Sequence, residues 1–493
     1  MITIKSRFLI LSIIPGVIIA MMLHACGFVQ ETNFLPNNFQ DPDAPFILSA
    51  TPSAGSKVDA SNITQVDIVF SEEVLGAEVL GNYRFSGDGS AGLTINLVTV
   101  IDMTSYRLTV SGVPGDGAVV LNIDNISDAL GNALADNTVS YTGWWDVSWS
   151  NRRRLVFDNS GQGQNLDNFP VMVKLDSGRV DYGVMQSGGE DIRFLDPDRS
   201  TLSHELEMWN ESGESVLWVT VPRIDAGSAS DYIWMYYGNT AVSDSQDVQG
   251  VWDDNYMLVW HMHDQPLGGA DDISESSRNL SLPDTGIGTS QGMVSGNRTI
   301  GSVGYGMTFN GSNQAIVPLS PNPGFFHDTF SNKMVTVWLK ADDTSGTQTI
   351  FEEGGSTNGF YLGIDPDGAN PDKVRVVSQN SNIIREVSSD AIDTLSYHYV
   401  VGAFSSSQTL TLYVDDVFSS FFNPTGYTSI GTHSGEPGVG FSPDSDAAET
   451  SGGGYFEGVI DELRISNAVR SADWIAAQYL SMADSLISFG IEE

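Results

Sequence analysis

The stretch YGMTFNGSNQAIV, residues 305–317, sets the first expectation for the fold. Apolar and polar residues alternate on both sides of the pair Asn310-Gly311, and an Asn-Gly pair between two alternating runs is a strong signal for a β-hairpin. Further runs of strand length, rich in β-branched and aromatic residues and separated by turn residues, lie at 333–340, 360–364, 373–377, 397–404, 409–414 and 458–466. The pattern predicts an all-β protein built from tandem β-sandwich domains.

The length of 493 residues predicts about three domains, at roughly 150 residues each. Hydrophobic residues make up 41% of the chain, which is enough for packed cores and excludes global disorder. The 62 Asp and Glu residues outnumber the 22 Lys and Arg residues, and the formal net charge is -40. This charge has the wrong sign for binding a phosphate backbone, so we expect no nucleic-acid partner.

The start of the chain predicts export. Lys5 and Arg7 precede an apolar run at 8–23, which is typical of a secretion signal. The following Leu-His-Ala-Cys, residues 23–26, resembles the bacterial lipobox and ends at Cys26, the only cysteine of the chain. The resemblance implies a signal peptide at 1–25, acylation of Cys26 and a membrane-anchored lipoprotein. An uncleaved signal-anchor helix is the alternative, because the apolar run nearly reaches the length that spans a bilayer.

Residues 26–45, rich in Asn, Pro and Asp, predict a tether between the lipid and the first domain. Gly27, and not Asp, follows the cysteine. By analogy with the sorting rules of bacteria with two membranes, this favours the outer membrane or the cell surface.

Tryptophan content marks the first domain boundary. Residues 46–142 contain no tryptophan, whereas 144–260 hold eight of the ten. Within 46–142 the stretches TPSAG (51–55), VFSEEV (69–74) and DALGN (128–132) resemble the bacterial immunoglobulin-like domain of S-layer type. That resemblance implies a spacer domain.

Residues 144–258 form a second expected domain. The runs WWDVSWSNRR (144–153), NFPVMVKL (168–175) and IWMYYGN (233–239) resemble an uncharacterised β module of exported bacterial proteins, often placed before a laminin-G-like domain. The resemblance implies an architecture and no activity.

Residues 259–489 form the third expected domain. VTVWLK (335–340), LTLYVDD (410–416) and the closing strand at 456–466 resemble the laminin-G-like, concanavalin A-type jelly roll. Behind the closing strand, Ser471 can cap a helix that turns Trp474, Ile475, Tyr479 and Met482 inward.

Two sets of residues suggest chemistry without completing a motif. In an expected strand at 257–264, His261 and His263 share one face with Val259, but two imidazoles need further ligands to bind zinc and no nearby spacing offers them. Residues at a domain junction are the favoured interpretation. Glu205 and Glu207 share a strand face but lack the central Asp of the glucanase motif. The sequence therefore favours a non-enzyme, with a glycoside hydrolase as the alternative.

Calcium is a possible cofactor, because several acidic turns offer oxygen ligands and many laminin-G-like domains bind this ion. The candidate ligands are Asp365, Asp367, Asp444, Asp446 and Asp461. Solvated turns are the alternative for the first four. Asp461 with Glu462 alternatively forms a buried structural pair.

Aromatic residues in turn-rich stretches predict a ligand site, since sugars stack on aromatic rings. The candidates are Phe325, Phe326, Phe421 and Phe422, whose alternative role is to close the end of the sandwich. The expected function is binding or adhesion at the cell surface, with a glycan or a protein as partner and calcium as support. A polysaccharide-degrading or enzyme-accessory protein and a structural envelope component are the alternatives.

Overall fold

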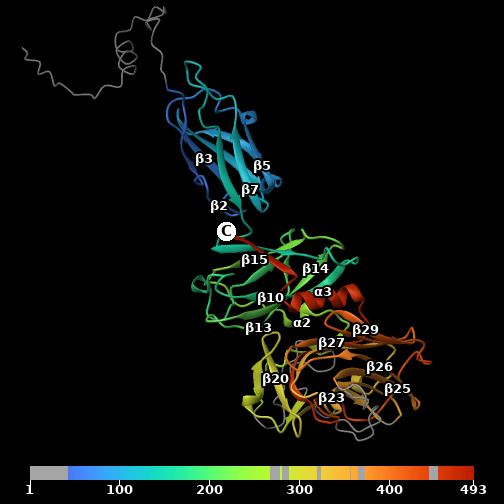
Figure 1. Ribbon diagram of the computed structural model, residues 1–493. Helices are drawn as coiled ribbons and strands as arrows, with labels where there is room; N and C mark the ends of the chain where they lie inside the picture. The colour runs from blue at the N-terminus through green and yellow to red at the C-terminus, as the bar shows by residue number, and fades with distance from the viewer. Residues whose placement is uncertain are drawn as a thin grey trace, which may run out of the picture. The chain divides into compact units, whose positions relative to one another are not determined.

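The computed structural model describes residues 43–266, 278–279, 288–318, 324–355, 357–364, 372–442 and 454–493. The expected all-β fold is confirmed. The chain divides into two compact units, residues 1–147 and 148–493, and each is described by itself (Figure 1). Among the described residues no helix has the length and apolar character needed to span a membrane.

Unit 1 is a two-layer sandwich. One sheet has the order β1-β3-β6-β5, with strands Ile47–Thr51, Gln65–Phe70, Ser105–Gly112 and Leu93–Val100. The other has the order β2-β8-β7-β4, with strands Lys57–Val58, Thr138–Gly143, Gly117–Ile123 and Tyr83–Ser86. Alternate residues of β3 and β7, among them Val66, Ile68, Val119 and Leu121, are buried in the core between the sheets. The alternation read from the sequence thus fixes which face of each strand is inside.

Unit 2 begins with a second sandwich. Its three-stranded sheet has the order β10-β14-β13, with strands Leu166–Leu175, Ser215–Ile224 and His204–Met208. Its other sheet has the order β12-β11-β15-β9-β32, with strands Thr201–Leu202, Arg193–Leu195, Tyr232–Tyr237, Asn151–Phe157 and Ile487–Glu492. Leu155, Phe169, Leu217 and Met235 lie in the core between these sheets.

The end of the chain belongs to this second sandwich. Strand β32 pairs with β9, and helix α3, Ala472–Met482, packs against β10. As predicted, Ser471 caps α3, accepting a hydrogen bond from the Trp474 backbone N–H. Trp474, however, lies in the core of the second sandwich and not in that of the third. A division of the chain at 258/259 therefore separates segments that pack together, because β32 completes the sheet that β9 begins.

The third sandwich lies in the same unit. Its nine-stranded sheet includes β16, β31, β22, β27, β28 and β29, with bounds Tyr256–Trp260, Glu457–Ser466, Lys333–Ala341, His398–Ser405, Thr409–Val414 and Val417–Phe422. The facing sheet includes β21, β23, β24, β25 and β26, with bounds Ala315–Pro318, Gln348–Gly354, Gly359–Ile364, Lys373–Asn380 and Ile383–Ala391. One continuous apolar core fills the space between the two sheets.

The hairpin expected at 305–317 is wrong. Strand β20, Tyr305–Asn310, pairs with β31, whereas β21 pairs with strands of the facing sheet. The Asn310-Gly311 turn, with Gly311 at φ +70°, carries the chain from one sheet to the other. Phe309 and Ile316 enter the same core from opposite sides. Alternation fixes the buried face of a strand but not its pairing partner, so the pattern fits both arrangements.

Candidate functional site

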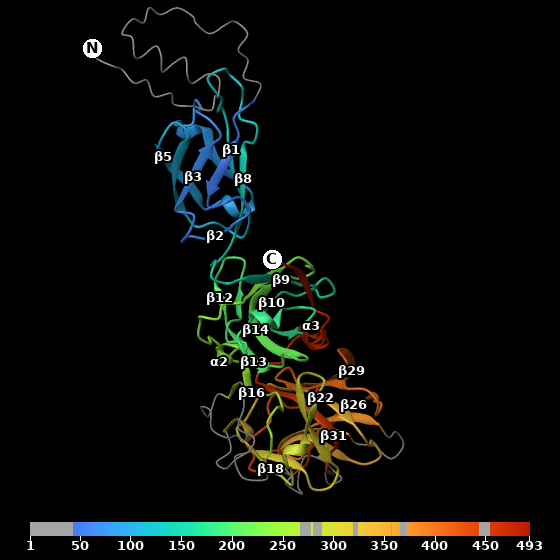
Figure 2. The ribbon, with the colours of Figure 1, turned by 90° about the vertical axis from the view of Figure 1, so that its left-hand side faces the viewer.

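Five ionisable side chains meet in the interior of unit 2. They lie near β16, the strand that follows the second sandwich in the chain and belongs to the larger sheet of the third (Figure 2). Glu205 and Glu207 come from β13, His261 directly follows β16, and Glu462 and Arg464 come from β31. Their side chains are exposed by 6% or less. We call these five residues the His261 network.

The imidazole of His261 is the centre of this network. Its Nδ1 lies 2.6 Å from Glu462 Oε1 and 3.5 Å from Glu207 Oε2, and its Nε2 lies 3.3 Å from Glu205 Oε1. Glu462 Oε2 accepts hydrogen bonds from Nε of Arg464, at 3.1 Å, and from Nη2 of the same guanidinium. Each buried charge therefore has an oppositely charged neighbour, which is what makes its burial tolerable.

Two tryptophans enclose the network. The indole N–H of Trp218 donates to Glu207 Oε2 at 2.7 Å, and that of Trp252 donates to Glu205 Oε2 at 3.0 Å. The guanidinium carbon of Arg464 lies 4.4 Å and 4.7 Å from the centroids of these two rings, which is cation-π geometry. The rings thus fix two of the carboxylates while excluding water.

Burial and mutual charge shift the pKa values of the network. Burial, reinforced by the Glu462 charge, raises the pKa of Glu207 to about 8. Burial also raises the pKa of Glu462, but His261 and Arg464 outweigh it and lower that pKa to about 2. For His261, burial lowers the pKa, yet the carboxylates of Glu462, Glu205 and Glu207 raise it well above 6.5. These shifts favour the charged forms of His261 and Glu462 and disfavour the charged form of Glu207.

Three of these groups have the spacing of metal ligands. One ligand atom each from Glu207, His261 and Glu462 lies within 4.8 Å of the others. However, 2.6 Å between Nδ1 and Oε1 is a hydrogen-bond distance, whereas tetrahedral zinc, with bonds of about 2.0–2.1 Å, holds its ligand atoms about 3.3 Å apart. Calcium binds about six to eight oxygen ligands. Here the Glu462 carboxylate instead pairs with the His261 imidazole and the Arg464 guanidinium. The geometry favours a hydrogen-bonded ion network.

Asp461, a predicted calcium ligand, lies beside this network. It is fully buried, and its Oδ2 accepts a hydrogen bond from the Val303 backbone N–H at 2.8 Å. Burial and the neighbouring Glu462 raise its pKa well above the ordinary value of 3.8, which disfavours the charged form of this carboxyl group. This placement favours the alternative in which Asp461 and Glu462 form a buried structural pair.

A glycine-containing loop closes the network on one side. A Cβ at Gly304 would lie 2.2 Å from Glu207 Oε1, and a Cβ at Gly301 would lie 2.4 Å from Asp461 Oδ2. The backbone therefore approaches both carboxyl groups closely. The network joins three segments that lie far apart in the sequence, which suits a structural role.

Sequence reasoning named most members of the network without connecting them. The alternation of Val259 and Trp260 is confirmed, since Val259 packs with Trp218 and Trp252 while Trp260 lies in the core of the third sandwich. The strand itself ends at Trp260 and not at 264. The partners of His261 come from β13 and β31, and motif spacing does not reveal pairs so distant in the chain.

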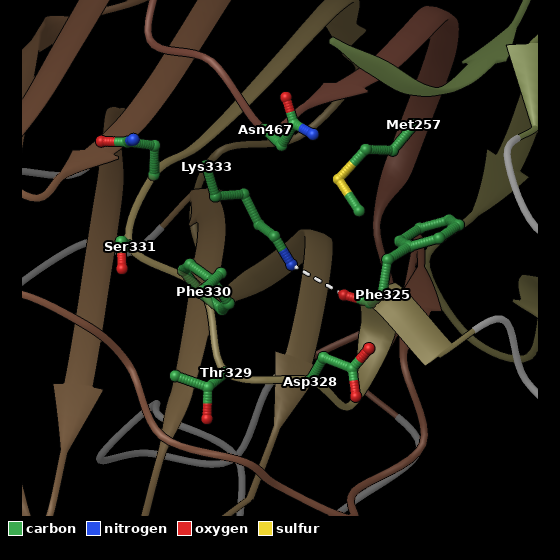
Figure 3. A pocket seen from close by; sticks show the side chains of 9 residues that line it. Met257, Phe325, Asp328, Thr329, Phe330, Ser331, Lys333 and Asn467 are labelled. Carbon is green, nitrogen blue, oxygen red and sulfur yellow. Dashed lines mark hydrogen bonds between the residues drawn. The ribbon is translucent and has the colours of Figure 1, made fainter. Parts of the chain in front are cut away.

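The third sandwich carries an open cavity of about 490 Å³ at one end (Figure 3). Its lining residues are Met257, Phe325, Asp328, Thr329, Phe330, Ser331, Asn332, Lys333 and Asn467. The Lys333 side chain, fully buried, reaches across its floor and donates to the Phe325 carbonyl oxygen at 3.3 Å and to the Glu353 carboxylate. Burial lowers the pKa of Lys333, and Glu353 opposes that shift. Glu353 thus neutralises the cation beneath the cavity.

The structure separates the four aromatic residues predicted to bind ligand. Phe326 is 2% exposed and belongs to the core, where the Phe325 ring packs against it in a tilted arrangement with centroids 4.3 Å apart. Phe325 is 7% exposed and contributes one wall of the cavity. Phe421 and Phe422 lie on the edge strand β29 and are 56% and 38% exposed. Packing therefore takes up most of the surface of Phe325 and Phe326. Phe421 and Phe422 are more exposed, although Phe418 lies 5.7 Å from the Phe421 ring centroid and the Arg385 guanidinium carbon 5.4 Å from that of Phe422.

Other predicted residues lie outside the described part of the chain. They are Cys26 and the candidate calcium ligands Asp365, Asp367, Asp444 and Asp446.

Two family models match parts of unit 2. A domain of unknown function, DUF2341, matches residues 188–264, and the concanavalin A-like lectin/glucanases superfamily matches residues 310–476. The two matches agree with the resemblances drawn from the sequence for the second and third segments. No curated protein matches the chain.

Several solved structures are similar in part. The CBM40 of the Ruminococcus gnavus IT-sialidase, bound to α2,3-sialyllactose, is 14% identical over 35% of this chain and 96% of its own, with a TM-score of 0.28. Domain 4 of the arabinanase AbnA from Geobacillus stearothermophilus, in complex with arabinotriose, is 16% identical over 45% of this chain and 96% of its own, with a TM-score of 0.31. The binding domain of Paraclostridial Mosquitocidal Protein 1 is 10% identical over 48% of this chain and 53% of its own, with a TM-score of 0.35. At these TM-scores the likeness carries no argument about function.

Proposed function

We propose that this protein is a non-catalytic, membrane-anchored binding lipoprotein whose third sandwich binds carbohydrate in the cavity above Lys333. One observation carries the proposal, namely the mixed lining of that cavity. Phe325, Phe330 and Met257 supply apolar surface, and hydroxyl, amide and carboxylate groups surround them. Sugar rings present an apolar face and a rim of hydroxyls, and a site of this composition complements both.

The carboxylates favour binding over hydrolysis. Glycoside hydrolysis normally uses two carboxyl groups that flank the sugar bond. Among the nine residues that line the cavity, Asp328 is the only carboxylate. Glu205 and Glu207, the carboxylate pair noted in the sequence, lie in the closed His261 network and cannot reach a substrate. Calcium support, expected at the acidic turns, remains part of the proposal.

The anchor is proposed from the sequence. Leu-His-Ala-Cys at 23–26 places Cys26 where a lipobox has its acylated residue, and multiple acyl chains give stable membrane attachment. Expression of the full chain and of C26S in a bacterial host tests this step. We expect the full chain in the membrane fraction with the mass of an acylated Cys26, and the variant without that mass increment.

A glycan array tests carbohydrate binding. We expect the full chain, purified in mild detergent, to bind specific glycans on the array. Comparing arrays run with calcium and with a chelator shows whether the ion contributes to binding. D328A/F330L alters the cavity, and F421A/F422A, on β29, is the matched control at the other predicted aromatic site. Loss of binding in D328A/F330L alone supports the cavity, provided that circular dichroism shows both variants folded. Loss of glycan binding in F421A/F422A alone, or a blank array, contradicts carbohydrate binding in the cavity. Release of shorter sugars from a bound glycan contradicts the non-catalytic role.

A further inference from the structure

Unit 1 has a groove of its own, independent of the carbohydrate site proposed above. Its volume is about 430 Å³, and its lining residues are Glu73, Glu78, Val100, Asp102, Met103 and Tyr106. It lies where β5 ends and the chain turns into β6, beside the segment that follows β3. The groove therefore combines three carboxylates with apolar side chains.

The apolar part of the groove is unusually open to water. Val100 is 54% exposed and Met103 is 68% exposed, and Leu97 and Ile101 next to them are 55% and 54% exposed. Strand β5 is also the last strand of its sheet. Edge strands with exposed apolar side chains are usually covered or charged, because their free backbone edge can pair with another chain. An extended segment fits such an edge.

Tyr106 forms the inner wall of the groove. It is 5% exposed and lines the groove together with the three carboxylates. Burial, and then the charges of Glu78, Glu73 and Asp102, raise the pKa of its hydroxyl, so all three carboxylates act on this one ring. The ring itself is held in place by Phe70, with centroids 5.8 Å apart.

The charges among the six lining residues of the groove are all negative. No Lys or Arg is among its lining residues, and Asp102 accepts hydrogen bonds only within its own turn, from Thr104 and Ser105. The net charge of -40 adds a long-range attraction for cations. A Lys or Arg side chain in the groove would meet three carboxylates at once, with its aliphatic stem along Val100 and Met103.

We propose that this groove binds an extended basic segment of a partner protein. A Lys or Arg of that segment lies among Glu73, Glu78 and Asp102, and the apolar residues on either side cover Val100 and Met103. Unit 1 is then a docking domain as well as a spacer.

A fluorescein-labelled peptide that alternates Val or Leu with Lys or Arg tests the proposal by fluorescence anisotropy on the full chain. We expect saturable binding, weakened by about tenfold in E73Q/E78Q, since two charges of the site are lost. D88N/D136N removes two exposed charges elsewhere in unit 1 and serves as the matched control, with binding expected to stay within about twofold.

Two further measurements separate the groove from general attraction to an acidic protein. M103S should weaken binding of the alternating peptide, and a peptide with Ser in place of Val and Leu should bind more weakly than the original. Equal losses in the two double variants, equal affinity for the Ser peptide, or no saturable binding would each overturn the proposal.

Discussion

His261 Nδ1 and Glu462 Oε1 lie 2.6 Å apart although 201 positions separate the two residues in the chain. His261 follows the strand that leaves the second sandwich, and Glu462 lies on a strand at the centre of the third sandwich's larger sheet. The contact, with those of Glu205, Glu207 and Arg464, is fully buried. Contacts between oppositely charged side chains, namely His261 and Arg464 with the glutamates, therefore join the two sandwiches of unit 2.

Substitution of Glu462 should destabilise unit 2. In E462Q the His261 imidazolium and the Arg464 guanidinium lose their shared carboxylate, and breaking a buried ion pair costs about 3–5 kcal/mol. Urea denaturation monitored by tryptophan fluorescence measures the free energy of unfolding. E457Q alters an exposed Glu on the same strand and should lower the free energy of unfolding by less than about 0.5 kcal/mol. Equal costs for the two variants would refute the structural role of the network.

Gly304 should resist substitution. Its φ is +53°, and a Cβ would lie 2.2 Å from Glu207 Oε1, so G304A introduces both backbone strain and a clash. We expect G304A to lower the free energy of unfolding by about 1–3 kcal/mol. Gly296, which has open space around its Cβ position, is the control. If G304A unfolds at the same denaturant concentration as G296A, then the loop does not close the network as described.

Strand β32 should stabilise the second sandwich. It pairs with β9, and Glu493 Oε2 accepts hydrogen bonds from the buried guanidinium of Arg152 at 2.7 and 2.9 Å. Ending the chain after Leu486 exposes the edge of β9 and leaves that guanidinium without its carboxylate. Hydrogen exchange should show faster exchange in β9 and unchanged protection in β22. Unchanged protection of β9 would mean that β32 is dispensable.

The pair His398 and Asp415 predicts a pH dependence of stability. The hydrogen bond between His398 Nδ1 and Asp415 Oδ2, 2.7 Å long, raises the pKa of His398 above its ordinary value of 6.5, and burial opposes the shift. A raised pKa in the folded state means that the protonated form stabilises the fold. This stability is fully present below about pH 6.5 and is lost as the pH rises through the raised pKa.

Urea denaturation between pH 5.5 and 8.5 measures this effect. D415N should flatten the loss of stability with rising pH relative to the unaltered chain, whereas D416N, at the neighbouring position, should keep the full slope. The same slope in all three proteins would exclude His398 as its source.

The sequence predicts much of the fold because burial follows alternation. The strands at 333–340, 360–364 and 409–414 occur as expected, and Ser471 caps its helix. Pairing is less predictable, since the alternating run at 305–317 serves two facing sheets as well as it would serve one hairpin. The return of β32 to β9 has no local signal, because it depends on a free strand edge formed more than 300 residues earlier.

The candidate sites show the same limit. The local sequence offers His261 too few partners, because its partners come from the distant strands β13 and β31. Aromatic residues in a turn-rich stretch make Phe325 and Phe326 candidates for a ligand site, yet composition alone does not show that the fold turns Phe326 into the core. The sequence marks Lys333 only as the start of a strand, because the Glu353 that neutralises its charge lies on the facing sheet.

Hydrogen exchange on the full chain with a bound oligosaccharide tests the central claim most directly. Using the best ligand from the glycan array, the account predicts slower exchange at residues 324–333, which form most of the cavity lining, and no change at 417–422 on β29. Protection confined to 417–422, or binding that leaves 324–333 unchanged, would contradict the cavity as the carbohydrate site.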